Sequence, residues 1–133
     1  MKHIFKFTTL IFVSFLLFSC DPSRNINFVN QTEAPIKIKF ILSANKTSQS
    51  LEEIAKGDSI VLNLKPKSTE YLYCGMGTWS ESELDNIAKG IKNIEIDTKD
   101  IKTVYKSRNS IIEILKDNRK GLLWKTSVEI KVD

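Results

Sequence analysis

Residues 122–132 show the most constraining pattern in the chain, a strict two-residue alternation. One face would carry Leu122, Trp124, Thr126, Val128, Ile130 and Val132, and the other Lys125, Ser127, Glu129 and Lys131. This period is typical of a β-strand with one buried face. A slip of one residue would turn the apolar row outward, so we expect a tightly fixed register with Trp124 pointing into the core.

Shorter alternations and turn signals predict six more strands, at residues 25–30, 36–42, 59–64, 69–74, 92–98 and 101–105. The pattern is clearest in residues 36–42, where lysines alternate with large apolar side chains. Residues 51–56 fit either a helical turn or a strand. The chain therefore contains seven strand segments on sequence grounds.

Two segments late in the chain have the signature of short helices. Residues 80–83, Ser-Glu-Ser-Glu, have the spacing of a capping box, and Gly90 marks the expected end of that helix. Residues 110–113, Ser-Ile-Ile-Glu, form a second such box. We expect Ser110 to cap a helix that runs to about Lys120, with Gly121 as the residue that follows it.

Seven strands and two short helices predict a mainly β protein. Our first expectation is a small antiparallel β-sandwich, and the alternative is an α+β sheet with both helices on one face. The first half resembles the opening strands of immunoglobulin-like sandwiches in its pattern. The Cys…Trp…Cys signature of true immunoglobulin domains does not accompany it.

The first twenty residues have the layout of a secretory signal. Lys2 and Lys6 give a basic start, residues 7–18 form a mostly apolar run, and Ser19 is a small residue before Cys20. The apolar run is shorter than the roughly 20 residues that span a bilayer core. A cleaved leader is therefore favoured over a transmembrane helix.

The end of this leader, Leu17-Phe18-Ser19-Cys20, resembles the lipobox of bacterial lipoproteins. The resemblance implies cleavage before Cys20, diacylglycerol on its sulfur and, usually, acylation of the new amine. Phe18 is bulkier than the residue most common there. The implied organisation is a removed signal peptide (1–19), a lipidated cysteine with a short tether (20–25) and a single β-rich domain (26–133). The alternative is an ordinary signal peptide that happens to end beside a cysteine.

Acylation would attach the chain stably to a membrane, because each buried CH2 contributes about 0.8 kcal/mol. The expected location is the bacterial cell envelope, with inner and outer membrane both left open. Of the 133 residues, 114 would remain after cleavage, and loss of Lys2 and Lys6 would lower the net charge from +4 to +2. This mild charge and the presence of only three arginines argue against nucleic acid binding.

Cysteine and histidine usage limits both fold and chemistry. The one histidine, His3, belongs to the leader, and Cys74 is the only cysteine besides Cys20. If Cys20 is acylated, Cys74 has no disulfide partner, so the fold must depend on its core. A nucleophilic thiol usually needs a base such as histidine, so we interpret Cys74 as a buried structural residue.

No cofactor or metal site is expected from the remaining motifs. Zinc sites need clustered cysteine and histidine. The acids Glu81, Glu83, Asp85, Asp97 and Asp100 do not match a calcium loop. Acids at the start of a helix are better explained by its dipole.

Residues 75–79, Gly-Met-Gly-Thr-Trp, form the candidate binding loop. Gly75, Met76, Gly77 and Trp79 could form an apolar contact surface together with Tyr71 and Tyr73. We favour the other interpretation, a glycine turn whose aromatic residues belong to the core, because tryptophan and tyrosine are mostly buried on average. Because Trp79 lies outside any alternating row, we expect its loss to cost less stability than the loss of Trp124.

These features together predict a lipid-anchored envelope protein without catalytic activity. It would bind another envelope protein or a glycan. A protective inhibitor or immunity-type lipoprotein is the second hypothesis. An enzyme that relies on carboxylates is the third, since the chain after Cys20 has no histidine to act as a base.

Overall fold

The structure is a computed structural model that describes residues 21–44, 48–121 and 124–133. The predicted signal peptide and lipidation site at Cys20 lie outside these residues. Within them, eight strands form two four-stranded sheets. The expectation of a mainly β sandwich with two short helices late in the chain is confirmed.

The first sheet has the strand order β4-β1-β8-β7. Its strands are β1 (Ser23–Asn30), β4 (Thr69–Met76), β7 (Arg119–Lys120) and β8 (Ser127–Val132). The second sheet has the order β3-β2-β5-β6. It contains β2 (Ile36–Leu42), β3 (Ser59–Leu64), β5 (Ile91–Asp97) and β6 (Lys102–Tyr105). All pairings are antiparallel except that of β1 with β8, which is parallel.

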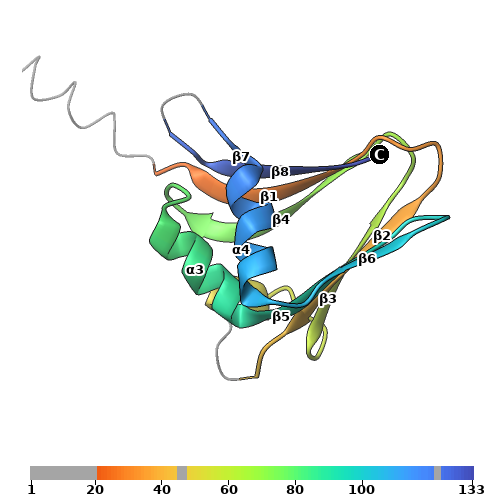
Figure 1. The fold of residues 1–133 in the computed structure, drawn as a ribbon. Helices are drawn as coiled ribbons and strands as arrows, with labels where there is room; N and C mark the ends of the chain where they lie inside the picture. The colour runs from red at the N-terminus through yellow and green to blue at the C-terminus, as the bar shows by residue number, and fades with distance from the viewer. Residues whose placement is uncertain (1–20, 45–47, 122–123) are drawn as a thin grey trace, which may run out of the picture.

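The helices are α2 (Gln49–Glu52), α3 (Glu81–Gly90) and α4 (Arg108–Asp117). Figure 1 shows the two sheets lying close together at the end where β1 turns into β2, and apart at the other end. Helices α3 and α4 occupy the wide end. Among the described residues, no helix combines the length and the apolar character needed to cross a membrane.

The core lies between the two sheets, where their inward rows meet. On β1, Ile26 and Phe28 are fully buried, and Phe28 packs edge-on against Phe40 of β2 with ring centroids 5.6 Å apart. The parallel pairing places Ile26 beside Val128 on β8. Val128, Ile130 and Val132 are all buried, as their alternation predicts.

Trp124 does not join this row, and the expectation that it points inward is wrong. Strand β8 begins only at Ser127, and the Trp124 side chain is 66% exposed. The short strand β7 pairs with Ser127 and Val128 alone, so the ladder ends before it reaches Trp124. Gly121 has φ +136°, and a side chain there would collide with the Trp124 carbonyl oxygen. Alternation in the sequence therefore extends beyond the paired strand.

The first predicted helix is confirmed, and the start of the second is corrected. Ser80 caps α3 by accepting a hydrogen bond from the Glu83 backbone N–H. Helix α4 begins at Arg108, and its cap is Ser107 rather than Ser110, with Ser107 Oγ 3.0 Å from the Ser110 backbone nitrogen.

The end of α4 also differs from the expectation. The helix stops at Asp117, and Arg119–Lys120 forms β7, so Gly121 follows a strand and not the helix. Local sequence favours a longer helix, but pairing with β8 takes Arg119 and Lys120 into the sheet. The ambiguous segment at 51–56 overlaps α2, which buries Leu51 completely.

Replacing Ser107 with alanine is expected to lower the unfolding free energy by about 1 kcal/mol, the usual cost of losing a side-chain cap. Ser110→Ala should cost less, because the Ser110 hydroxyl bonds to Ser107 and caps no backbone N–H. Urea unfolding of both variants measures the difference. Equal losses would mean that the helix has two alternative starts.

Candidate functional site

Trp79, the largest residue of the candidate binding loop, is a core residue that is only 2% exposed, so it does not belong to an exposed contact surface. Its ring Nε1 donates a hydrogen bond to the Asn25 carbonyl at 3.2 Å, and its backbone N–H donates to the Lys125 carbonyl at 2.5 Å. The Arg24 guanidinium lies over the ring, 5.3 Å from its centroid. The favoured interpretation, a glycine turn with a buried aromatic, is the one that describes Trp79.

The two glycines of this loop lie where the backbone turns close to the Arg24 side chain. Arg24 donates two hydrogen bonds to the Cys74 carbonyl and forms an ion pair with Glu83 at 3.0 Å. Gly75 has φ +103°, and a side chain there would lie 3.1 Å from Arg24 Nη2. Gly77 has φ +101°. The glycines therefore allow the chain to turn around a half-buried arginine, and only Met76 of the loop is well exposed.

Cys74 lies in the core beneath this loop. Burial raises the pKa of its thiol to about 12, although the Arg24 charge and a hydrogen bond with the Ile26 backbone act in the opposite direction. The thiol therefore stays protonated at neutral pH, and a thiolate nucleophile is not available. This environment favours the structural interpretation of Cys74.

We expect the folded protein to leave Cys74 unmodified by dithionitrobenzoate at mildly alkaline pH, and unfolding in urea to make it react at once. The pKa of the Cys74 thiol is 9.0 in the unfolded chain and about 12 in the folded protein. The unfolded chain therefore loses this proton first, and the unfolding free energy falls as the pH rises from 9.0 towards 12. Rapid reaction of the native protein would show that Cys74 is accessible.

The acidic residues of α3 are paired with cations and do not converge. The pairs are Glu81 with Arg119, Glu83 with Arg24, and Asp85 with Lys89. Hydrogen bonds from Lys89 and Arg108 hold the pKa of the Asp85 carboxyl below its usual value. Asp97 faces Lys102, and Asp100 is exposed. In the described part of the chain, no three acidic, cysteine or histidine side chains gather in a group that could hold a metal ion.

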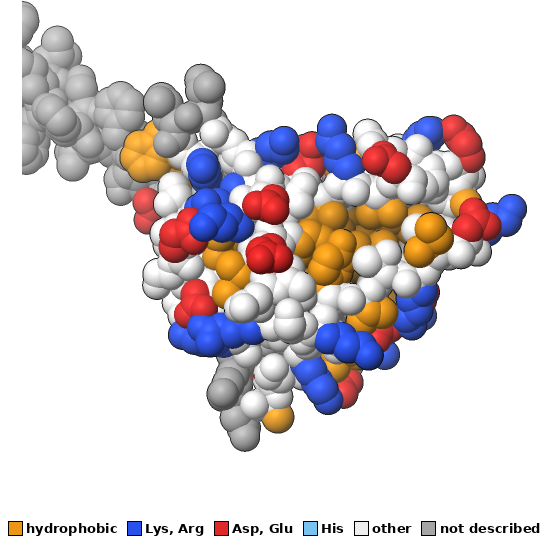
Figure 2. All heavy atoms as spheres, in the orientation of Figure 1, with side chains coloured by type: hydrophobic (Ala, Val, Ile, Leu, Met, Phe, Trp, Pro, Cys, Tyr) orange, Lys and Arg blue, Asp and Glu red, His pale blue; other side chains and the backbone are white. Residues whose placement is uncertain are grey.

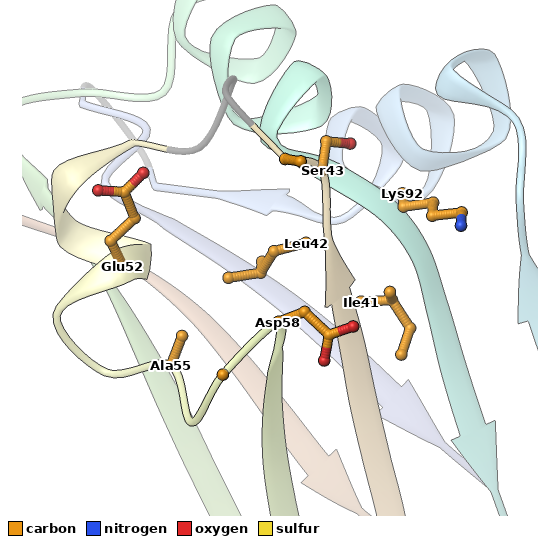
Figure 3. A pocket seen from close by; sticks show the side chains of 9 residues that line it. Ile41, Leu42, Ser43, Glu52, Ala55, Asp58 and Lys92 are labelled. Atoms are coloured by element: carbon orange, nitrogen blue, oxygen red, sulfur yellow. The ribbon is translucent and has the colours of Figure 1, made fainter.

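A pocket of about 480 Å³ lies where β2, β5, α2 and the start of β3 meet. Glu52 and Asp58 are the acidic residues that line it, each with a carboxyl group. Figure 3 shows these two groups pointing away from each other, and Lys92 pointing away from both. This arrangement does not bring an acid and a base together around one substrate atom, as carboxylate catalysis requires.

The strongest candidate is a groove of about 530 Å³ between β3 and β4, which we call the β3–β4 groove. These strands follow one another in the chain but belong to different sheets. Alternation on β4 buries Leu72 and Cys74 and turns Tyr71 and Tyr73 outward. Tyr71 is 68% exposed and Tyr73 40%.

Two further apolar side chains line the same groove. Val61 comes from β3 and Ile54 from the turn after α2, and each is 43% exposed. Lys56 and Glu70 place one charge of each sign on the rim. The groove thus combines apolar walls with a few polar groups, which is the usual composition of a protein contact surface.

The strands beside the groove are sheet edges without the usual protection. Neither β3 nor β4 contains lysine, arginine or proline, the residues that proteins commonly use to prevent edge strands from pairing with other chains, and Glu70 on β4 is the one charged residue of the two strands. At the opposite edges, β6 contains Lys102 and β7 consists of Arg119 and Lys120. The unprotected edges lie on one side of the molecule.

Figure 2 shows a second apolar area, where hydrophobic side chains are visible between the two sheets beside α4. Figure 1 shows β8 and β6 on the two sides of this opening. The inward side chains of these strands are buried or half-buried, among them Ile130, which is 4% exposed, and Tyr105. The charged residues on its flanking strands make it a weaker candidate than the β3–β4 groove.

Of the contact residues expected from the sequence, Tyr71 and Tyr73 line this groove, whereas Met76 and Trp79 do not. Val61 was not expected here. It occupies the solvent face of a strand where a polar residue is usual, and that exception was the available signal. Comparison with protein-family models, with curated proteins and with solved structures found no match for the chain.

Proposed function

We propose that this chain is a lipid-anchored protein of the bacterial cell envelope that binds an extended segment of another envelope protein in the β3–β4 groove, without catalysis. The anchor is supported by the leader and by the lipobox resemblance at Cys20. The binding role is supported above all by one observation, the two exposed tyrosines on an unprotected edge strand.

Edge strands bind extended peptides because their backbone N–H and C=O groups lack a partner on one side. A segment added beside β4 would gain affinity from hydrogen bonds with these backbone groups. Its specificity would come from the fit of its alternate side chains against the groove. Tyr71 and Tyr73 suit this role, because tyrosine offers a large contact area and a polar tip with little rotamer entropy to lose. The neighbouring Val61 and Ile54 would cover the apolar side of such a segment.

The environments of the reactive groups support a binding role over an enzymatic one. Cys74 is a protonated, buried thiol, and the acids of α3 are paired with cations. The carboxyl groups of Glu52 and Asp58 point apart in their pocket. None of these arrangements supplies an activated nucleophile or a matched acid and base.

The anchor is tested with Cys20→Ala in cells that produce the full chain. We expect the variant to leave the membrane fraction or to accumulate as uncleaved precursor, and metabolic labelling with palmitate to disappear. Ser19→Ala keeps a small residue at the cleavage site and serves as the control, which should be labelled like the parent. Equal labelling of Cys20→Ala would disprove the lipoprotein assignment.

Binding is tested with a photo-crosslinking amino acid at position 71 in the intact envelope. We expect a specific adduct that Tyr73→Ser and Val61→Lys both abolish, because each changes the groove without removing a buried core residue. The same crosslinker at Thr103, an exposed residue on β6 at the opposite edge of the second sheet, is the control. An adduct that persists in both groove variants, or that forms equally from position 103, would contradict the proposed site.

A further inference from the structure

The start of the domain lies very close to Cys20 in the chain. Strand β1 begins at Ser23, and the Pro22 carbonyl already accepts a hydrogen bond from the Gly77 backbone at 2.7 Å. Cys20 is two residues from Pro22, and two residues extend at most about 7 Å. A lipid on Cys20 would therefore hold this end of the domain against the bilayer surface.

The register identifies what lies along this end of the first sheet. Ser23 pairs with Met76 at the end of β4, and the Asn25 N–H bonds to the Thr126 carbonyl just before β8. Lys120 at the end of β7 pairs with Ser127. Figure 1 shows the described chain beginning at this same end of the sheet. The ends of these four strands form a row roughly 15 Å across, at about 4.8 Å per strand spacing. We call this row of strand ends the anchor-side edge, as distinct from the edge strands β4 and β7.

The anchor-side edge presents apolar and basic side chains to solvent. Met76 is 55% exposed and Trp124 is 66% exposed. Lys120 and Lys125 are exposed, and within the described residues neither forms an ion pair. Asp21, the residue before Pro22, is also exposed, so these three charges sum to one positive charge.

We propose that this edge, defined by Met76, Lys120, Trp124 and Lys125, is a membrane-contact surface that rests on anionic phospholipid headgroups. The inference depends on the proposed anchor at Cys20. Tryptophan favours the interface between water and hydrocarbon. Lysines close to an anionic membrane surface are attracted to it. Together they would hold the domain in one orientation, which the lipid on Cys20 alone would not.

This orientation also keeps the β3–β4 groove open. Tyr71 lies five residues along β4 from Met76, which is roughly 16 Å at about 3.3 Å per residue. The strands would stand away from the bilayer, with Met76 at the surface and Tyr71 above it. A partner segment could then reach the groove without displacing the domain from the membrane.

The test uses the full lipidated chain, purified in detergent from bacterial membranes and returned to vesicles of phosphatidylethanolamine and phosphatidylglycerol. Some of the lipids carry bromine near the glycerol ester, where it quenches tryptophan at the interface. We expect blue-shifted, quenched emission from Trp124. Trp124→Phe should lose the quenched component and leave only the emission of the buried Trp79.

Two further variants test orientation and charge. Trp124→Phe with Ile101→Trp moves the exposed tryptophan to the β5–β6 turn, where Ile101 is 67% exposed, and its emission should escape quenching. Lys120→Glu with Lys125→Glu should lower quenching in vesicles that contain phosphatidylglycerol and change it little in pure phosphatidylcholine.

The outcomes separate this inference from the anchor. A chain that carries lipid by mass spectrometry and floats with the vesicles, yet shows no quenching of Trp124, overturns the contact surface and leaves the anchor intact. Equal quenching from position 101 also overturns it, because the domain would then have no preferred orientation. A chain without lipid that fails to float overturns both proposals.

Discussion

Trp79→Ala is expected to remove a large share of the domain's unfolding free energy, whereas Trp124→Ala should leave its stability nearly unchanged. Trp79 is 2% exposed, donates two hydrogen bonds and packs beneath Arg24. Replacing such a residue with alanine typically costs about 3–5 kcal/mol. A domain of this size is usually stable by only about 5–15 kcal/mol. The loss therefore removes a large share of the total.

Trp124 is the matched control, since it is the same residue type in an exposed position. Surface substitutions of this kind usually change stability by less than about 0.5 kcal/mol. Urea unfolding of the chain from residue 21, followed by far-UV circular dichroism, measures both variants without relying on tryptophan emission. If Trp124→Ala proved as destabilising as Trp79→Ala, Trp124 would have to be packed against the domain.

Asn30→Ala is expected to lower the unfolding free energy by about 1–3 kcal/mol, the range for leaving buried polar groups without partners. Asn30 is 1% exposed and lies where β1 ends and the sheets approach each other. Its Nδ2 donates to the carbonyls of Ala34 at 2.8 Å and Lys65 at 2.9 Å. Its Oδ1 accepts from the Thr32 backbone N–H and hydroxyl. One side chain thus joins the β1–β2 turn and the β3–β4 turn, both of which connect the two sheets.

Two further variants separate hydrogen bonding from volume. Asn27→Ala removes an asparagine from the same strand whose side chain makes no hydrogen bond among the described residues, and it should cost much less. Asn30→Asp keeps the acceptor but directs a carboxylate at two carbonyl oxygens. Its loss relative to the parent should shrink on acidification, when the carboxyl group gains a proton to donate. A loss that is independent of pH would contradict this explanation.

Local pattern predicted the elements well but not their ends. The inward row of β8, the cap at Ser80 and the mainly β fold all follow from side chains a few positions apart, where periodicity and capping act. The start of α4 at Ser107 was missed because Ser110 has the same local chemistry. Strand β7 was missed because its two residues, Arg119 and Lys120, show no strand pattern of their own.

The sequence by itself determined which residues alternate, the lack of a disulfide partner for Cys74 if Cys20 is acylated, and the lipobox-like pattern before Cys20. The tertiary structure alone decided which tryptophan is buried. Trp124 continues the two-residue alternation of β8. Alternation places side chains on one buried face only where the strand remains paired, and β7 ends before it reaches Trp124. Trp79 has no periodic pattern, yet Arg24 and the Asn25 carbonyl, which are distant in sequence, enclose it. The β3–β4 groove likewise exists because two consecutive strands join different sheets, a choice made by long-range pairing that no local window contains.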